Sequence, residues 1–134
     1  MVMSAGVICS GDGLELAAVI EAIDSGRLPL EIKIVITDRD SPALSLARTA
    51  GLYGAFIPRA AFHANRDGFE RRLVEMMTQA GVEAVILAGF EREVGPVLSE
   101  AFPDRLLGQG LGPEELTAFL EKKLRGGLFR LATE

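Results

Sequence analysis

The stretch Ala5–Leu16, AGVICSGDGLEL, decides the fold that this sequence predicts. Its apolar start, Gly6–Cys9, is typical of a short buried strand, and the glycines after it are typical of a tight turn. A helix is predicted over Leu14–Ile23, because apolar residues recur there on one face. A strand, a glycine turn and a helix start together direct free backbone N–H groups at an anion. We therefore expect a ligand site at this turn, with the candidate residues Ser10, Gly11, Asp12, Gly13, Leu14 and Glu15.

The composition predicts a single domain over residues 1–134, in a chain that is 49% hydrophobic. One cysteine cannot form an internal disulfide, so we expect a cytoplasmic, reducing setting. No apolar run reaches the ~18 residues that span a bilayer, and the first residues lack the pattern of a signal peptide. A net charge of −5 and few aromatic residues argue against nucleic-acid binding. We therefore expect neither a membrane nor a nucleic acid as a partner.

Strand-like and helix-like segments alternate along the rest of the chain. Apolar runs predict strands at residues 32–36, 53–57, 82–88 and 106–107, and a small edge strand at Leu128–Leu131. Helices are predicted to begin at Pro42, near Asn65, at Pro96 and at Pro113. This alternation predicts an α/β fold, a Rossmann-like three-layer sandwich with a mostly parallel sheet of about five strands.

Ligands of such folds bind beyond the carboxyl ends of the strands, where the order of the strands reverses. The loops that begin near Ser10, Thr37 and Gly89 each follow a predicted strand. We therefore expect these three loops to lie along one edge of the sheet.

Four ordered segments resemble the phosphoribosylglycinamide formyltransferase family: Val7–Gly13 with the helix after it, Ala61–Leu73, Val85–Arg92 and Arg105–Leu107. The resemblance covers roughly residues 5 to 107, so the chain is similar to the N-terminal half of that family's domain. It implies a role in purine biosynthesis, in which the family transfers a formyl group from 10-formyltetrahydrofolate to the amine of glycinamide ribonucleotide. It also implies ligand-binding positions at Arg66, Gly89, Glu91 and Arg92.

The positions that carry the family's chemistry differ in this chain. The resemblance implies a catalytic Asn and His just after Arg105–Leu107, where this sequence has Gly108 and Gly110. A glycine has no side chain with which to polarise a formyl carbonyl or move a proton. The family's catalytic Asp belongs to a second half that is not matched, and the single histidine, His63, precedes the third helix.

We therefore expect a catalytically degenerate family member with no catalytic residues. It would bind a small ligand or a partner protein, and it would need 10-formyltetrahydrofolate only if it is active.

The expected phosphate site also departs from the family. The resemblance places the family's Gly-Ser-Asn phosphate turn at Gly13, Leu14 and Glu15, and an arginine that reaches the phosphate at Arg66. A hydroxyl and an amide are thus replaced by a hydrocarbon and a carboxylate.

Further acids would surround this site. Glu91 replaces a Met, and Glu93 replaces an apolar residue that meets the pterin, so Asp12, Glu15 and these two residues would form a ring of carboxylates. Two unit charges ~5 Å apart repel by roughly 3 kcal/mol at an effective dielectric constant of ~20. We expect weak or no binding of a ribonucleotide phosphate.

Ordinary structural roles would also explain several of these residues. Glu15 would complement the dipole of a helix start, and Asp12 would bond its local backbone in a turn. Arg92 would pair with a nearby Glu, and Cys9 would be a small buried hydrophobe. With one His and one Cys, the sequence shows no metal site of ordinary ligand count, and no other cofactor is expected.

Three other functions stay open on the sequence. One is active formyl transfer to glycinamide ribonucleotide or a related amine, with chemistry from other residues or from a partner chain. A second is a dinucleotide-binding module, because Asp38 closes the second strand and Gly11 and Gly13 supply two of the three fingerprint glycines. The third is an assembly module, because the sheet edge at Leu106–Leu107 would be bare and would favour a homodimer.

Overall fold

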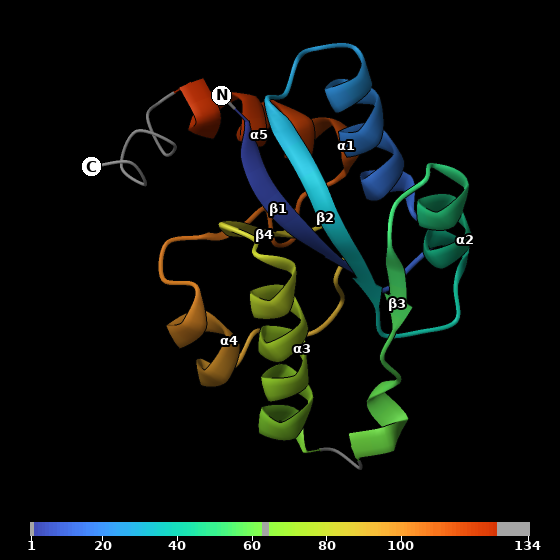
Figure 1. The fold of residues 1–134 in the computed structure, drawn as a ribbon, viewed down its shortest axis with the longest axis vertical. Helices are drawn as coiled ribbons and strands as arrows, with labels where there is room; N and C mark the ends of the chain where they lie inside the picture. Colours follow the sequence, from blue (N-terminus) through green and yellow to red (C-terminus); the bar gives the residue numbers. More distant parts are fainter. Residues whose placement is uncertain (1, 63–64, 126–134) are drawn as a thin grey trace.

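Five strands alternate with helices in the part of the chain that the structure describes, residues 2–62 and 65–125 of a computed structural model (Figure 1). The strands are β1 (Met3–Cys9), β2 (Leu30–Thr37), β3 (Gly54–Phe56), β4 (Ala84–Leu87) and β5 (Leu106–Leu107). The helices are α1 (Leu14–Asp24), α2 (Pro42–Thr49), α3 (Arg66–Ala80), α4 (Pro96–Ala101) and α5 (Pro113–Arg125), with a 3₁₀ turn, η1, at Arg59–Phe62. The strand predicted at Leu128–Leu131 lies outside the described residues.

β1 is the central strand of a sheet with the order β3-β2-β1-β4-β5, and all of its pairings are parallel. β2 pairs with one edge of β1, with Cys9 opposite Thr37, and β4 pairs with the other edge. The chain therefore builds outward from β1 to β3 and then returns to the far side of β1. This reversal creates a switch point at the carboxyl ends of β1 and β4, where open α/β sheets bind ligands. The predicted α/β, Rossmann-like fold is confirmed.

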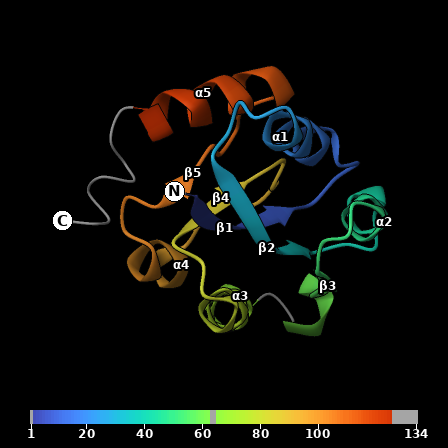
Figure 2. The ribbon, with the colours of Figure 1, turned by 45° about the horizontal axis from the view of Figure 1, so that its top comes forward.

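Helices cover both faces of the sheet, as a parallel sheet requires. Figure 2 shows α1, α2 and α5 on one side of the strands and α3 and α4 on the other. One buried cluster joins α1, α2 and α5 to the strands, and a second cluster joins α3 and α4 to them. None of the helices in the described part of the chain combines the length and the hydropathy that crossing a bilayer requires.

The observed boundaries differ from the predicted ones mainly at strand ends. β1 begins at Met3 rather than Gly6, because Met3 and Ala5 are fully buried and pair with β2. β4 covers only four residues, within the predicted 82–88. The start of α3 agrees with the prediction, since the Asn65 side chain accepts a hydrogen bond from Gly68 N at 3.0 Å and caps the helix.

A buried carboxylate fixes α4 against α3 and so positions the loop after β4. Glu70 is only 2% exposed, and it accepts hydrogen bonds from Gly95 N at 2.5 Å and Leu98 N at 2.9 Å. These N–H groups belong to the start of α4 and have no partner within that helix. The side chain of α3 thus takes the place of a cap that the sequence of α4 does not supply.

Replacing Glu70 by Ala should lower the free energy of unfolding by about 2–4 kcal/mol, because two buried N–H groups lose their acceptor. Glu70→Gln keeps one amide oxygen and should cost about half as much. Glu75→Ala, on the exposed side of the same helix, is the matched control and should change stability by less than about 0.5 kcal/mol. Urea titration followed by circular dichroism measures these costs, and an unchanged midpoint for Glu70→Ala would contradict the capping role.

Candidate functional site

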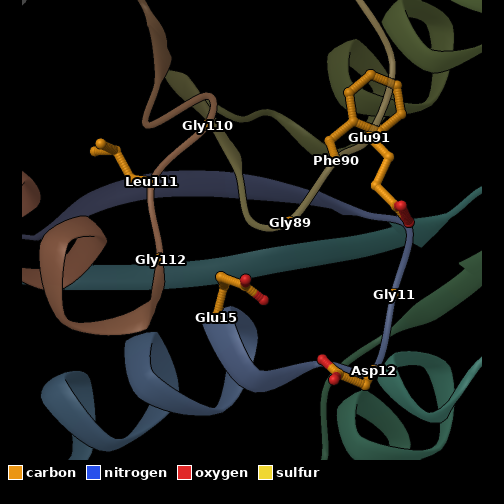
Figure 3. Close-up of a pocket in the computed structure, with 9 residues that line it drawn as sticks. All are labelled: Gly11, Asp12, Glu15, Gly89, Phe90, Glu91, Gly110, Leu111 and Gly112. Atoms are coloured by element: carbon orange, nitrogen blue, oxygen red, sulfur yellow. The ribbon is translucent and has the colours of Figure 1, made fainter.

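A cleft of about 450 Å³ opens at the switch point, beyond the carboxyl ends of β1, β4 and β5 (Figure 3). Three loops form its wall, and its lining residues are Gly11, Asp12, Glu15, Gly89, Phe90, Glu91, Gly110, Leu111 and Gly112. Four of these nine residues are glycines, so much of the wall is backbone. The three charged residues are all acids, so the wall presents negative charge.

The start of α1 forms one edge of this cleft, and Gly13 positions it. Gly13 adopts φ 90°, and a Cβ built there would lie 3.1 Å from Ala43 Cα in α2, so a glycine is required. The first free N–H of the helix is already used, because Leu14 N donates to Asp12 Oδ1 at 3.2 Å. This bond confirms the local role expected of Asp12. Leu14 itself is 60% exposed and points away from the core.

Glu15 brings a second carboxylate into the cleft. Figure 3 shows its side chain extending from the first turn of α1 toward Gly89 on the opposite loop. A Cβ at position 89, where φ is 73°, would lie 2.9 Å from Glu15 Oε2, so the glycine makes this approach possible. Because Glu15 also lies in the first turn of α1, it complements the helix dipole and adds negative charge to the cleft.

Ser10 fixes the loop after β4 to the end of β1. Its backbone N donates to Gly89 O at 3.3 Å, and its hydroxyl accepts from Glu91 N at 3.1 Å. Ser10 is fully buried, so it supports the cleft from behind and does not line it. The side chain of Glu91 reaches solvent and pairs with Arg39 from the loop after β2, with Nη1 3.0 Å from Oε1.

The two arginines expected at the ligand site lie apart from the cleft, beside α3. Arg66 begins α3, and its guanidinium group lies against Gly95. Arg92 stacks over the ring of Phe69, with Cζ 5.7 Å from the ring centroid. Burial, together with the neighbouring cations Arg59 and Arg66, lowers the pKa of Arg92. Within residues 2–62 and 65–125 Arg92 forms no ion pair, so the pairing expected with a Glu is not found.

Asp38, the candidate for holding a ribose, does not line the cleft. Its side chain is completely buried after β2, and Arg59 Nε lies 3.0 Å from its Oδ2. The contact is an ion pair without hydrogen-bond alignment, because no described donor meets either carboxylate oxygen in hydrogen-bond geometry. An acid buried in this way exposes no oxygen to a sugar hydroxyl in the cleft, so the geometry disfavours the dinucleotide alternative.

Cys9 is the buried hydrophobe that the sequence predicts. Burial raises the pKa of its thiol to about 12, and the charges of Glu15 and Asp38 add to this effect. The thiolate does not form near neutral pH, so Cys9 is no nucleophile. In the described part of the chain, no three His, Cys, Asp or Glu side chains lie close enough together to hold a metal ion.

Helix α5 fills the space beside the first of the two expected catalytic positions. Gly108 follows β5 with φ 91°, and a Cβ built there would overlap Cδ1 of Leu116. Leu116 is fully buried in the cluster that α5 shares with α1. Gly110 also has a positive φ, 80°, but it lines the cleft and has open space around it. A side chain at position 108 would therefore displace the Leu116 side chain, whereas one at 110 has open space on a similarly strained backbone.

The structure brings together some of the residues that the sequence suggests for a site and separates others. Gly11, Asp12, Glu15, Gly89 and Glu91 share the cleft wall. The remaining candidates lie behind or beside it: Ser10, Gly13, Leu14, Arg66 and Arg92, as does Glu93.

Sequence reasoning missed the contribution of the loop after β5 to the cleft wall. The residues that it missed there are Gly110, Leu111 and Gly112, and it also missed Phe90 in the loop after β4. The only signal for the loop after β5 is the glycine-rich run 108–112, which directs attention to lost chemistry and not to the wall of a cleft.

Known proteins are similar to this chain in sequence and in fold. A family profile described as formyl transferase matches residues 3–108. The phosphoribosylglycinamide formyltransferase of Escherichia coli (strain K12) is 29% identical over 106 residues, which are 78% of this chain and 50% of that protein. The chloroplastic phosphoribosylglycinamide formyltransferase of Arabidopsis thaliana is 28% identical over 121 residues, which are 90% of this chain and 41% of that protein. The chain spans about half the length of the curated relatives it matches.

Solved structures of similar proteins have the same fold. The glycinamide ribonucleotide transformylase 1 from Symbiobacterium toebii superposes with a TM-score of 0.74 at 36% identity, over 78% of this chain and 50% of that one. The phosphoribosylglycinamide formyltransferase from Coxiella burnetii superposes with a TM-score of 0.73 at 32% identity, over 79% of this chain and 50% of that one.

Gly108→Ala should destabilise the protein by about 2–4 kcal/mol, because the methyl group adds an overlap with Leu116 to an unfavourable left-handed backbone. Gly110→Ala is the matched control, since its backbone is also left-handed but its surroundings are open, and it should cost only about 1 kcal/mol. Combining Gly108→Ala with Leu116→Ala should cost less than the sum of the two single changes. Chemical denaturation measures all four variants, and equal costs at positions 108 and 110 would count against the Leu116 contact.

Proposed function

The chain belongs to the formyl transferase family, and we propose that it is a catalytically inactive member that binds a small molecule in the switch-point cleft. In this proposal residues 1–134 act as one domain of the N-terminal formyltransferase type, in the cytoplasm. The activity, substrates and partners of its full-length relatives do not transfer to it directly, because it corresponds to about half of their length.

The observation that carries the proposal is the contact between Gly108 and Leu116. Formyl transfer to an amine requires a group that stabilises the developing oxyanion and a group that takes up the proton of the amine. Gly108 has no side chain, and the buried side chain of Leu116 fills the space beside it. The ionisable groups of the cleft wall are carboxylates, and an ionised carboxylate repels an oxyanion. These features support the proposal of an inactive member, which would not use 10-formyltetrahydrofolate as a formyl donor.

The charge of the cleft supports a ligand other than a ribonucleotide phosphate. A phosphate at the start of α1 would compete with Asp12 for Leu14 N and would face Glu15 in the same cleft. Each carboxylate at ~5 Å would cost roughly 3 kcal/mol per unit of phosphate charge at an effective dielectric constant of ~20. A neutral or cationic small molecule meets no such repulsion.

Active formyl transfer is the second candidate function. Family membership favours it, and so does the open space at Gly110, which faces the cleft. It would require groups supplied by another chain to stabilise the oxyanion and to move the proton. An activity assay separates the two candidates.

The protein, mixed with glycinamide ribonucleotide and 10-formyltetrahydrofolate, should yield no formylated product above the uncatalysed background. The full-length Escherichia coli relative, assayed under the same conditions, is the positive control. Measurable turnover by this chain alone would overturn the proposal.

Binding measurements accompany the assay. Calorimetry should detect no micromolar binding of glycinamide ribonucleotide, because of the acids in the cleft. A thermal-shift panel of ribonucleotides, folates and polyamines should show a shift with a cationic compound and none with the phosphates. Micromolar binding of glycinamide ribonucleotide would contradict the charge argument.

We also propose that the outer edge of β5 pairs with a second copy of the chain. One edge of β5 pairs with β4, and no other described strand covers the opposite edge. Unpaired strand edges favour association with another chain. Analytical ultracentrifugation at tens of micromolar should therefore show a dimer, and a monomer at that concentration would contradict this assembly.

A further inference from the structure

The strand β3 leaves a second edge of the sheet without a partner strand. It stands at the end of the strand order opposite β5, as Figure 2 shows, and only β2 pairs with it among the described strands. Ile57 N, just after β3, donates to Thr37 O of β2 at 2.9 Å. Successive residues of a strand direct their backbone groups to opposite edges, so the N–H and C=O groups of Gly54 and Phe56 face outward.

The side chains along this edge have a pattern that is complementary to itself. Gly54 faces α2, because a Cβ built there would lie 3.0 Å from Leu44 Cδ1 and 3.7 Å from Arg48 Cγ. Phe56 shares that face, two residues further along the strand, and is 43% exposed. Ala55 faces the opposite side and packs on the cluster of α3. An exposed ring therefore stands beside a position that has no side chain.

We propose that β3 pairs with β3 of a second copy, antiparallel, about a two-fold axis that passes between the two Ala55 residues. Gly54 of each copy then lies opposite Phe56 of the other, and each of these pairs exchanges two backbone hydrogen bonds. The Phe56 ring covers Gly54 of the other copy and lies beside the Arg48 side chain there. A guanidinium group over an aromatic ring adds a cation–π attraction.

The charges on α2 also favour this arrangement. Asp40 precedes the first turn of α2, whereas Arg48 belongs to its last turn, and both residues are exposed. Neither forms an ion pair among residues 2–62 and 65–125. Antiparallel β3 strands place the two α2 helices antiparallel on one face of the joined sheet. The end with Asp40 in one copy then lies toward the end with Arg48 in the other, so opposite charges approach each other.

This inference goes beyond the proposed function, because it concerns neither the cleft nor the edge of β5. The two edges lie at opposite ends of the sheet, so pairing at one leaves the other free. If both edges pair, assemblies larger than a dimer should form as the protein concentration rises.

A disulfide between two Ala55→Cys chains tests the arrangement and its register. In the proposed pairing the two Cα atoms of residue 55 form a non-hydrogen-bonded pair about 4.5 Å apart, within the range that a disulfide spans. Cys9 gives no background, because it is fully buried and the pKa of its thiol is about 12. Oxidised glutathione should therefore link Ala55→Cys into a covalent dimer.

Glu21→Cys, at an exposed position of α1, is the matched control and should remain unlinked under the same conditions. A dimer joined through β5 would place the two copies of residue 55 at far ends of the joined sheet and would not link them. Linking of Ala55→Cys that does not exceed that of Glu21→Cys would overturn the β3 pairing, whether or not β5 pairs.

A charge on the edge should prevent the pairing. Phe56→Lys, added to Ala55→Cys, should lower the yield of covalent dimer about five-fold, because the ring is lost and like charges meet across the axis. Val2→Lys adds the same charge at an exposed apolar residue ahead of β1, so this matched control should leave the yield unchanged. Equal yields from the Phe56→Lys and Val2→Lys proteins would contradict the proposed contact.

Hydrogen exchange tests the same edge without a new cysteine, in case Ala55→Cys fails to fold. In the unmodified protein the amide hydrogens of Gly54 and Phe56 should exchange more slowly as the protein concentration rises, because the second copy covers them. The amide hydrogen of Ile57 already bonds to β2, so its exchange should change much less. Exchange at Gly54 and Phe56 that does not depend on concentration would overturn the pairing.

Discussion

The packing of α5 against α1 places a buried leucine, Leu116, beside Gly108 at the end of β5. Leu116 is fully buried in that contact, and its Cδ1 would overlap a Cβ built on residue 108. Burial of a leucine side chain stabilises a protein by roughly 1.5–3 kcal/mol, so this contact is a substantial part of a marginal total. In this arrangement the Leu116 side chain and any side chain at position 108 compete for one space, and Leu116 fills it.

At the carboxyl edge of the sheet, the acids of the first turn and two of the arginines lie in different places. Asp12 and Glu15 face the switch-point cleft, whereas Arg66 begins α3 and Arg92 lies over a ring of that helix; a third arginine, Arg39, pairs with Glu91 of the cleft wall. A helix start that would otherwise receive an anion is met by the chain's own carboxylates, one bonded to its first free N–H and one in its first turn. Backbone geometry alone therefore does not decide which ligand binds, because the side chains set the sign of the charge that the ligand meets.

Local features of this fold follow from the sequence, and long-range ones do not. The β1–turn–α1 unit can be predicted from the sequence, because an apolar run, two glycines and a helical period stand next to one another. The burial of Glu70 cannot be predicted from the sequence, because a Glu on a helix ordinarily faces solvent and the N–H groups that bind Glu70 belong to another helix. The pairing of Arg39 with Glu91 requires the strand order, which brings loops far apart in the chain to one edge. The fit of Leu116 over Gly108 depends on how α5 docks, which no local pattern specifies.

The contact between Leu116 and Gly108 is the centre of this account, and methyl-selective NMR tests it most directly. In protein with labelled leucine methyl groups, strong nuclear Overhauser effects should join a Leu116 δ-methyl group to the Gly108 α-protons. They should persist when glycinamide ribonucleotide is added in excess. Absence of these effects, or their loss on addition of the nucleotide, would show that the space beside Gly108 is free and would contradict the account.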